Sequence, residues 1–331
     1  MLERIGEEMN PLLIVLSFTA VAIMRVIQKV CSKKVSGEVG GKNFFHYGGY
    51  YNLMSALFSL VTFAFVGFNG FDLPTVLCAF GTAVLMAVEL FASIEALKGC
   101  TLIVSQMFSV GALFIPCFVG IFLFDEPMSV WQWLGLLLFM VAMYFMVAPT
   151  KEKSESVPTK KMSVKTIIYL IVCLVACGGT MVVQKVFAVL VPNGNVATYS
   201  FLMFALNALI LYACYVVVLF LKRSKGALKT ENTAVETATN MEMPARRSWQ
   251  RLSKVLLVCG LLLAFAVFVV NMLVTELGKT IPSAILFSVS YAISIIITIL
   301  VGAVYYKEKI TQKNIVGIIL CVGALAIINF L

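Results

Sequence analysis

The chain alternates long apolar stretches with short polar segments along nearly its whole length. Each apolar stretch covers roughly 18–25 residues, the length that a helix needs to cross about 30 Å of hydrocarbon. This pattern predicts an all-α polytopic membrane protein with ten transmembrane helices. The expected spans are residues 11–30, 45–67, 73–97, 100–124 and 129–148 in the first half, and 164–191, 195–221, 252–276, 281–305 and 312–330 in the second.

The last two elements of each half form a repeat. Residues 124–146 recur as residues 306–328 at an offset of 182, with a Glu, a Ser or Thr helix cap and then an apolar helix rich in small residues. The offset places Glu126 on Glu308, Ser129 on Thr311 and Gly135 on Gly317. We expect the Glu side chains to be hydrated at helix starts, and Gly135, Gly317 and Gly323 to allow close helix packing.

This duplication divides the chain into two five-helix repeats. The first covers residues 1–150, a polar linker covers 151–163, and the second covers 164–331. Residues 222–251 form the longest polar loop; a short surface helix near Trp249 is one alternative, and disorder is the one we favour. Because each repeat has an odd number of spans, the two insert in opposite directions and are inverted.

Composition agrees with a membrane protein. Apolar residues make up 61% of the 331 and charged residues 12%, with a mean hydropathy of +1.00. Soluble domains contain about 25% charged residues. The nine cysteines lie mostly in or beside apolar runs. We expect them to be small packing residues, and the spacing of Cys173 and Cys177, with no histidine nearby, does not favour a metal site.

Basic residues predict the orientation. The segments after the first, third, fifth, seventh and ninth spans hold 21 of the 25 Lys and Arg residues, whereas the opposite side holds only Arg4 and Lys279. Positive residues concentrate in cytoplasmic loops. The bias therefore places both termini outside, and the net charge of +9 favours contact with membrane lipid over binding of nucleic acid.

Other classes of membrane protein lack a supporting motif. The one histidine, His46, stands beside Phe44 and Phe45 without a catalytic or metal-binding pattern, and the chain contains no Walker sequence. The sequence therefore predicts neither an enzyme nor a nucleotide-driven pump, and it indicates no metal or cofactor. Channels usually build their pores by symmetry around an axis along the membrane normal, whereas the repeats predicted here are inverted.

The chain resembles the drug/metabolite transporter superfamily in its ten-span form with two EamA-type repeats. The resemblance rests on the repeated end hairpins and on two matching segments before them, Glu95-Ala96-Leu97-Lys98 and Glu276-Leu277-Gly278-Lys279. It implies a secondary transporter that exports or exchanges a small metabolite or drug-like molecule across the cell membrane by alternating access. An amino acid or an amine is one candidate substrate, and a proton or sodium ion is the candidate coupling ion.

Two alternatives stay open. A lipid-head-group flippase of the same superfamily would have a cavity that opens sideways to lipid, and a structural membrane protein would transport nothing. Ten spans form a complete two-repeat unit, so a monomer suffices for transport.

Ionisable groups within apolar spans are the first candidate site residues, because they cost several kcal/mol unless paired or hydrated. Glu89 lies in the third span and is a candidate proton carrier or anchor for an amine; the alternative is a structural pair with Arg25 or Lys185. The repeat places Asn271 of the eighth span within about one residue of the position equivalent to Glu89.

Arg25 and Gln28 lie three residues apart at the end of the first span and share a helix face. They suit an anionic or zwitterionic substrate, or alternatively hydrogen bonds between helices. A second trace of duplication, Gln-Lys-Val, matches Lys29 to Lys185 at an offset of 156. We expect Lys29 to extend to the membrane interface and Lys185, which is deeper, to have a functional role.

Polar stripes on the fourth and ninth spans complete the candidates. Ser105 with Ser109, and Ser290 with Ser294, are each one helical turn apart. Such stripes either bind a substrate or let helices pack through hydrogen bonds. Gly178, Gly179 and Pro116 are candidate points of bending. The predicted site residues are Glu89, Arg25, Gln28, Gln106, Lys185, Asn271, Ser105 and Tyr291.

Overall fold

The computed structural model describes an all-helical protein. The described residues are 11–36, 39, 42–67, 70, 72–124, 129–147, 163–191, 194–233, 253–307 and 312–330, and no strand occurs among them. The helices are α2 (Pro11–Val35), α3 (Lys42–Val66), α4 (Leu73–Leu97), α5 (Leu102–Gly111), α6 (Phe114–Leu123), α7 (Val130–Val147), α8 (Val164–Leu190), α9 (Val196–Thr233), α10 (Lys254–Leu277), α11 (Ser283–Val304) and α12 (Gln312–Phe330).

Within the described ranges, six helical stretches are long and apolar enough to cross a membrane, so the protein has the character of a multi-pass membrane protein. Two further helices, at Val130–Ala142 and Ile315–Ile328, are apolar but shorter. The six stretches are Val15–Val35, Leu73–Leu97, Val104–Leu123, Val164–Leu190, Val196–Phe220 and Lys254–Leu277.

The surface is apolar and part of the interior is polar. Phe65 is 86% exposed and Phe122 80% exposed, whereas Asn52 and Asn207 are fully buried. Water-soluble proteins seldom expose large contiguous apolar patches, but lipid is a favourable environment for such side chains. This distribution fits a bundle whose outer face meets hydrocarbon.

Polar residues define several helix starts. The Asp72 side chain accepts a hydrogen bond from the Thr75 backbone N–H at the start of α4, and its bond with the Thr75 hydroxyl holds the pKa of this carboxyl below its usual value. At α7, Ser129 and Gln132 exchange backbone-to-side-chain hydrogen bonds of 2.9 and 3.2 Å, which confirms the predicted Ser cap. Thr311, Glu126 and Glu308 lie outside the described residues.

The fourth predicted span, 100–124, is two helices rather than one. α5 ends at Gly111 and α6 begins at Phe114, with a turn in which the Leu113 N–H bonds the Val110 carbonyl at 3.0 Å. The cause is Pro116, which has no N–H to donate and whose ring crowds the carbonyl four residues earlier. Gly178 of α8 packs against this break, because a Cβ there would lie 2.7 Å from the Ala112 carbonyl oxygen.

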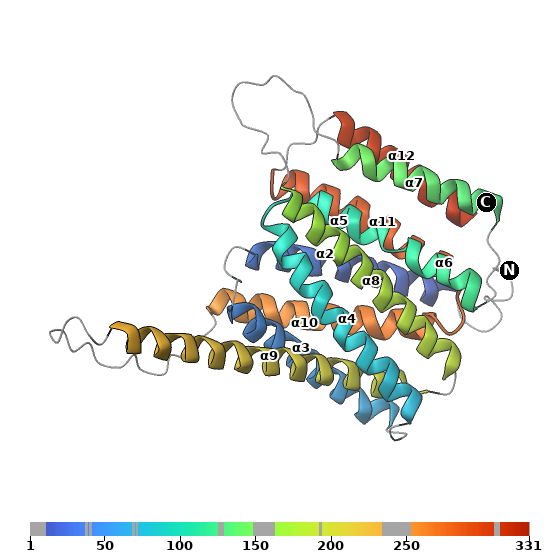
Figure 1. Ribbon diagram of the computed structural model, residues 1–331. Coiled ribbons are helices and arrows are strands. Elements are labelled where there is room, and N and C mark those ends of the chain that lie inside the picture. Colours follow the sequence, from blue (N-terminus) through green and yellow to red (C-terminus); the bar gives the residue numbers. More distant parts are fainter. Residues whose placement is uncertain are drawn as a thin grey trace, which may run out of the picture.

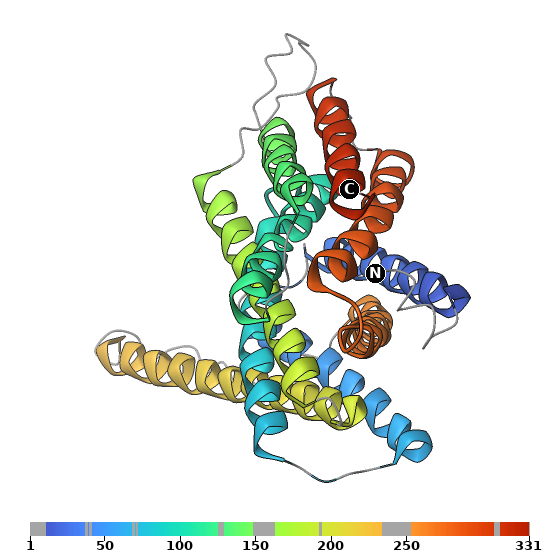
Figure 2. The same ribbon diagram turned by 90° about the vertical axis from the view of Figure 1, so that its right-hand side faces the viewer.

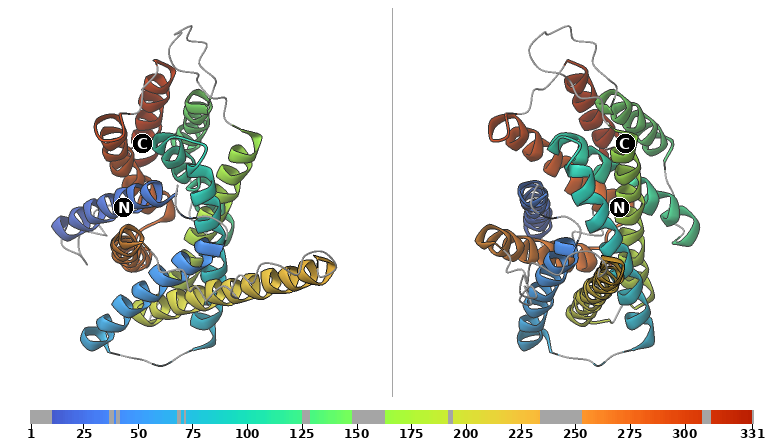
Figure 3. Two further views of the ribbon diagram at one scale, coloured as in Figure 1. Left: turned by 90° about the vertical axis from the view of Figure 1, so that its left-hand side faces the viewer. Right: turned by 60° about the vertical axis from the view of Figure 1, so that its left-hand side comes forward.

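The loop predicted over residues 222–251 begins later than expected. α9 continues to Thr233, twelve residues past the predicted end of the seventh span at 221, so the expectation of disorder is wrong for residues 222–233. Residues 222–233 include three lysines and one each of arginine, alanine, leucine and glutamate, which favour helix, and no proline. Its turns project beyond the neighbouring helices (Figure 3).

The helices are arranged in two outer pairs around a central group. α7 packs mainly against α12, and α3 against α9; these pairs lie at opposite ends of the molecule in Figures 1 and 2. Between them, α2 packs along α10 and α4 along α8. α2 begins and α12 ends on the same side of the bundle (Figure 1). The central helices form the walls of the site described below.

A lysine from α2 caps the C-terminal end of α4. The Lys33 ammonium donates hydrogen bonds to the backbone carbonyls of Leu97, at 3.0 Å, and Cys100, at 2.8 Å. The last carbonyls of a helix lack partners within it and carry partial negative charge. Lys33 therefore satisfies the last carbonyl of α4 and one carbonyl in the turn that follows, and attaches α4 to α2.

Two glycines of the repeated hairpin test its packing. A Cβ on Gly135 of α7 would lie 2.9 Å from the Ala324 carbonyl oxygen of α12, whereas a Cβ on Gly323 would meet no atom within 4 Å. The predicted packing role therefore fits Gly135 and is wrong for Gly323. We expect Gly135→Ala to lower the free energy of unfolding by about 1–3 kcal/mol, through overpacking against backbone.

Gly323→Ala is the matched control. We expect it to be neutral or to stabilise the protein by up to about 1 kcal/mol, because alanine favours helix over glycine. Thermal unfolding of both variants in detergent, followed by tryptophan fluorescence, measures the difference. Equal stability of the two variants would contradict close packing at Gly135.

Candidate functional site

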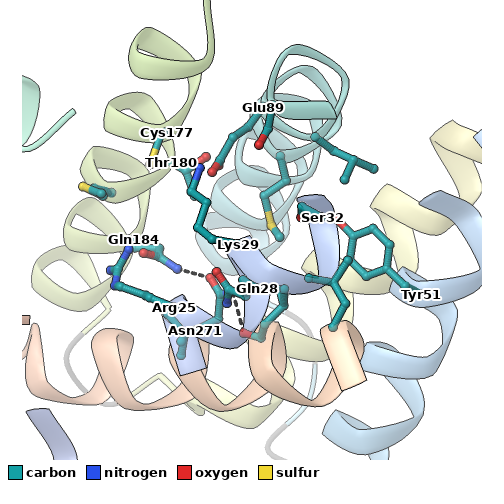
Figure 4. A pocket seen from close by; sticks show the side chains of 17 residues that line it. Arg25, Gln28, Lys29, Ser32, Tyr51, Glu89, Cys177, Thr180, Gln184 and Asn271 are labelled. Carbon is teal, nitrogen blue, oxygen red and sulfur yellow. Dashed lines mark hydrogen bonds between the residues drawn. The ribbon is translucent and has the colours of Figure 1, made fainter. Parts of the chain in front are cut away.

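A cavity of about 110 Å³ lies among the central helices. Its walls come from α2, α4, α8 and α10, with one residue from α3, and Figure 4 shows the side chains that line it. They are Arg25, Gln28, Lys29, Ser32, Tyr51, Met86, Glu89, Leu90, Ser93, Cys177, Thr180, Met181, Gln184, Leu263, Val267, Val270 and Asn271. Four of the eight predicted site residues are among them: Arg25, Gln28, Glu89 and Asn271.

One face of α2 supplies most of the polar wall. Arg25, Gln28, Lys29 and Ser32 follow one another at spacings of three, one and three residues, which places them on a single side of the helix. The predicted shared face of Arg25 and Gln28 is therefore confirmed. It extends one turn further than expected and includes Lys29 and Ser32.

Arg25 is held by Tyr291 of α11. The guanidinium Nη1 donates to the Tyr291 hydroxyl at 2.5 Å, and the guanidinium carbon lies 4.0 Å from the centre of the Tyr291 ring. The Tyr291 hydroxyl also lies 3.5 Å from the Cys177 sulfur. Tyr291 is 1% exposed and does not line the cavity, so it supports Arg25 from outside the cavity wall.

Glu89 lies on the α4 wall opposite this cationic face. In Figure 4 the Lys29 side chain extends from α2 toward Glu89. Within the described part of the chain, however, the ion pairs shorter than 4 Å join only Lys98 to Glu95 and Lys279 to Glu276. The cavity charges therefore face one another without direct contact.

Amide groups close the end of the cavity between α8 and α10. Gln184 donates a hydrogen bond to the Asn271 side-chain oxygen, and the Asn271 amide nitrogen donates to the Val267 carbonyl at 2.8 Å. Both residues are buried, at 5% and 7% exposure. These bonds fix the amides in place and join the two helices across the cavity wall.

The polar stripe residues connect helices around the cavity. Ser105 of α5 accepts a hydrogen bond from the Lys29 ammonium at 3.3 Å, and Gln106 donates to the Ser294 hydroxyl of α11 at 3.1 Å. Ser290 bonds back to the Leu286 carbonyl in its own helix at 2.9 Å. Of the two readings left open by the sequence, the contacts of Ser105 and Ser294 match helix packing, whereas the Ser290 bond lies within its own helix.

Lys185 lies away from the cavity. It is 6% exposed, and its ammonium donates to the carbonyls of Gly278, at 3.1 Å, and Ile281, at 3.0 Å, at the C-terminal end of α10. A buried ammonium needs such acceptors, and helix ends supply them. The structure thus places Lys185 at a helix end and places Lys29, which we expected at the interface, in the cavity.

Several cavity residues carried too weak a signal in the sequence. Ser32 and Ser93 are small, and the hydroxyl of Thr180 bonds the Ala176 carbonyl of its own helix. Cys177 was expected only to pack. Two other cavity residues did carry a signal. Gln184 matches Gln28 in the repeated Gln-Lys-Val segment, and Lys29 lies four residues after Arg25, on the same helix face.

Comparison with known proteins identifies a fold but no family. No protein-family model and no curated protein matches the chain. Among solved structures, 28 chains match it. One of them, described only as "Crystal structure of protein", has a TM-score of 0.58 and 13% sequence identity over 95% of this chain and 94% of that chain. At this identity the likeness shows a shared helical fold and nothing of function.

The Arg25–Tyr291 contact generates a prediction. Tyr291→Phe removes the hydroxyl acceptor and keeps the ring under the guanidinium, so we expect a loss of about 0.6–1.7 kcal/mol in the free energy of unfolding. Tyr291→Leu also removes the ring and should cost about 0.5–2 kcal/mol more. Thermal unfolding in detergent measures both losses.

Tyr144→Phe serves as the control, since Tyr144 is 70% exposed and its described contact is a ring contact with Phe145. We expect no change in stability. A Tyr291→Phe protein as stable as this control would mean that the hydroxyl does not support Arg25.

Proposed function

We propose that this protein is a secondary transporter that moves a small polar molecule across a membrane by alternating access. The observation that carries the proposal is a charged cavity lined by central helices of both halves, in a bundle with an apolar surface. Ionisable groups are costly in such surroundings and usually mark a substrate or ion pathway. Transporters place their substrate sites between repeats near the centre of the bundle.

Helix packing supports two inverted five-helix repeats. In this proposal α2, α3, α4, the α5–α6 pair and α7 correspond to α8, α9, α10, α11 and α12. Exchanging the two sets converts each main contact into another observed contact: α2–α10 into α8–α4, α3–α10 into α9–α4, and α2–α11 into the contacts of α8 with α5 and α6. Such exchange is expected of repeats related by a pseudo-twofold axis.

Side-chain contacts follow the same correspondence. Lys98 pairs with Glu95 near the end of α4, and Lys279 pairs with Glu276 near the end of α10, each over three residues. The offset is 181 for both partners (276 minus 95 and 279 minus 98). On this register Asn271 corresponds to position 90, one residue from Glu89, in agreement with the sequence-based expectation.

Membership of the drug/metabolite transporter superfamily, in the ten-span EamA-type form, is the family assignment that we propose. It is supported by the repeated hairpins and by the helix exchange described above. The basic residues favour an orientation with both termini outside. The start of α3 and the end of α9, which adjoin basic loops, would then lie in the cytoplasm. The common side for the start of α2 and the end of α12 is compatible with this orientation (Figure 1).

Reconstitution tests the proposal directly. Proteoliposomes are loaded with a defined mixture of amino acids, amines, organic acids and nucleosides, and mass spectrometry identifies the compounds that leave faster than from protein-free liposomes. Counterflow with such a compound should be saturable and should exchange substrate across the membrane. Absence of protein-dependent exchange for every compound would contradict a transporter of small metabolites.

Glu89→Gln is expected to reduce this exchange about tenfold or more, because it removes a carboxylate from the cavity wall and preserves the size of the side chain. Glu95→Gln on the same helix is the matched control, since Glu95 pairs with Lys98 outside the cavity. It should exchange at the wild-type rate. Wild-type exchange by an inserted Glu89→Gln protein would exclude an essential role for Glu89.

A further inference from the structure

Lys29 and Lys185 match in the sequence repeat, but their hydrogen bonds differ. The repeated Gln-Lys-Val segment matches Lys29 with Lys185. By hydrogen bonding, however, the counterpart of Lys185 is Lys33. Each caps the C-terminal end of a corresponding helix, and the acceptor carbonyls again differ by 181 positions (278 minus 97 and 281 minus 100). Lys29, one turn before Lys33, therefore has a different task.

Lys29 makes few contacts for a partly buried ammonium. Its described hydrogen bond goes to the neutral hydroxyl of Ser105 at 3.3 Å, although an ammonium can donate three. In the described residues it forms no ion pair within 4 Å. Lys33 and Lys185, by contrast, each donate to two carbonyls. The Lys29 ammonium thus retains donor capacity on the cavity wall.

The charges on the cavity wall do not balance. Arg25 and Lys29 are cations one helical turn apart on α2, and among the described residues that line the cavity Glu89 is the one carboxylate. The Arg25 Nε atom is also buried and has no hydrogen-bond partner in the described part of the chain. An excess of positive charge on partly buried side chains is unfavourable unless an anion or water compensates it. The N–H groups without acceptors and the excess charge therefore lie on the same face of α2.

We propose that Lys29 and Arg25 bind the anionic group, a carboxylate or a phosphate, of a small molecule in this cavity. This inference rests on the proposed transport function, whose substrate class it specifies. Lys29 is the selective element, because the Arg25 guanidinium is already engaged by Tyr291. Glu89, on the opposite wall, faces the remainder of the molecule and disfavours a second anionic group there.

A series of similar small probes tests the charge requirement. Ethanolamine carries only a cation, propionate only a carboxylate, β-alanine both groups, and phosphoethanolamine a phosphate with an amine. Thermal stabilisation of the purified protein is measured in a neutral detergent for each probe. We expect at least one anion-bearing probe to stabilise the wild-type protein at concentrations where ethanolamine does not. Comparing propionate and β-alanine with phosphoethanolamine distinguishes carboxylate from phosphate.

Variants assign the effect to Lys29. Lys29→Met should raise the half-saturating concentration of the effective probe about tenfold or more, and Lys29→Arg should retain most of the effect. Lys33→Met is the matched control on the same helix: it should lower the unfolding temperature without probe and leave the half-saturating concentration unchanged. If Lys29→Met cannot be purified, Lys29→Gln replaces it, and the wild-type series needs no variant.

The outcomes separate this inference from the transport proposal. Equal stabilisation by ethanolamine, no response of the wild-type protein to any anion-bearing probe, or an unchanged response in Lys29→Met would overturn the anion site. Probe binding that depends on Lys29 without counterflow would keep the anion site and remove the transport proposal. Counterflow of ethanolamine that is independent of Lys29 would do the reverse.

Discussion

Charged side chains inside an apolar helical bundle need a partner or water, and this requirement governs how the central helices are arranged. Arg25, Lys29 and Glu89 lie on helices whose other faces are Leu, Val, Ile and Phe. Tyr291 satisfies part of the Arg25 guanidinium, and Ser105 meets Lys29. The remaining N–H groups of Arg25 and Lys29 face the cavity between α2, α4, α8 and α10. Purely apolar helices would pack closely there and leave no such space.

The same requirement explains the polar groups outside the cavity. Lys33 and Lys185 bond the carbonyls at the ends of α4 and α10, positions where a helix cannot satisfy itself. Gln106 and Ser294 satisfy one another between α5 and α11. Polar residues that complete helix ends or helix contacts therefore hold the bundle together. The cations of the cavity are satisfied only in part, Arg25 by Tyr291 and Lys29 by Ser105, and this difference distinguishes the candidate site from the structural polar network.

Arg25, Gln28, Glu89 and Asn271 were predictable because a polar side chain within a long apolar stretch stands out, and helical spacing places the first two on one face. The roles of Lys29 and Lys185 were not. Position along the helix suggested that Lys29 would extend to the interface and that Lys185, being deeper, would line the site. Their contacts follow instead from which carbonyls and hydroxyls the neighbouring helices bring within about 3 Å.

The sequence by itself determined the class of protein and most helix positions, because apolar length, caps and prolines act locally. Leu73–Leu97 agrees with its predicted range at both ends, and Pro116 accounts for the break between α5 and α6. Only the tertiary structure decided that α2, α4, α8 and α10 line one cavity, that Tyr291 supports Arg25 from 266 residues away, and that Lys33 and Lys185 bond carbonyls where α4 and α10 end. Contacts at such separations depend on how complete helices pack, which no local pattern specifies.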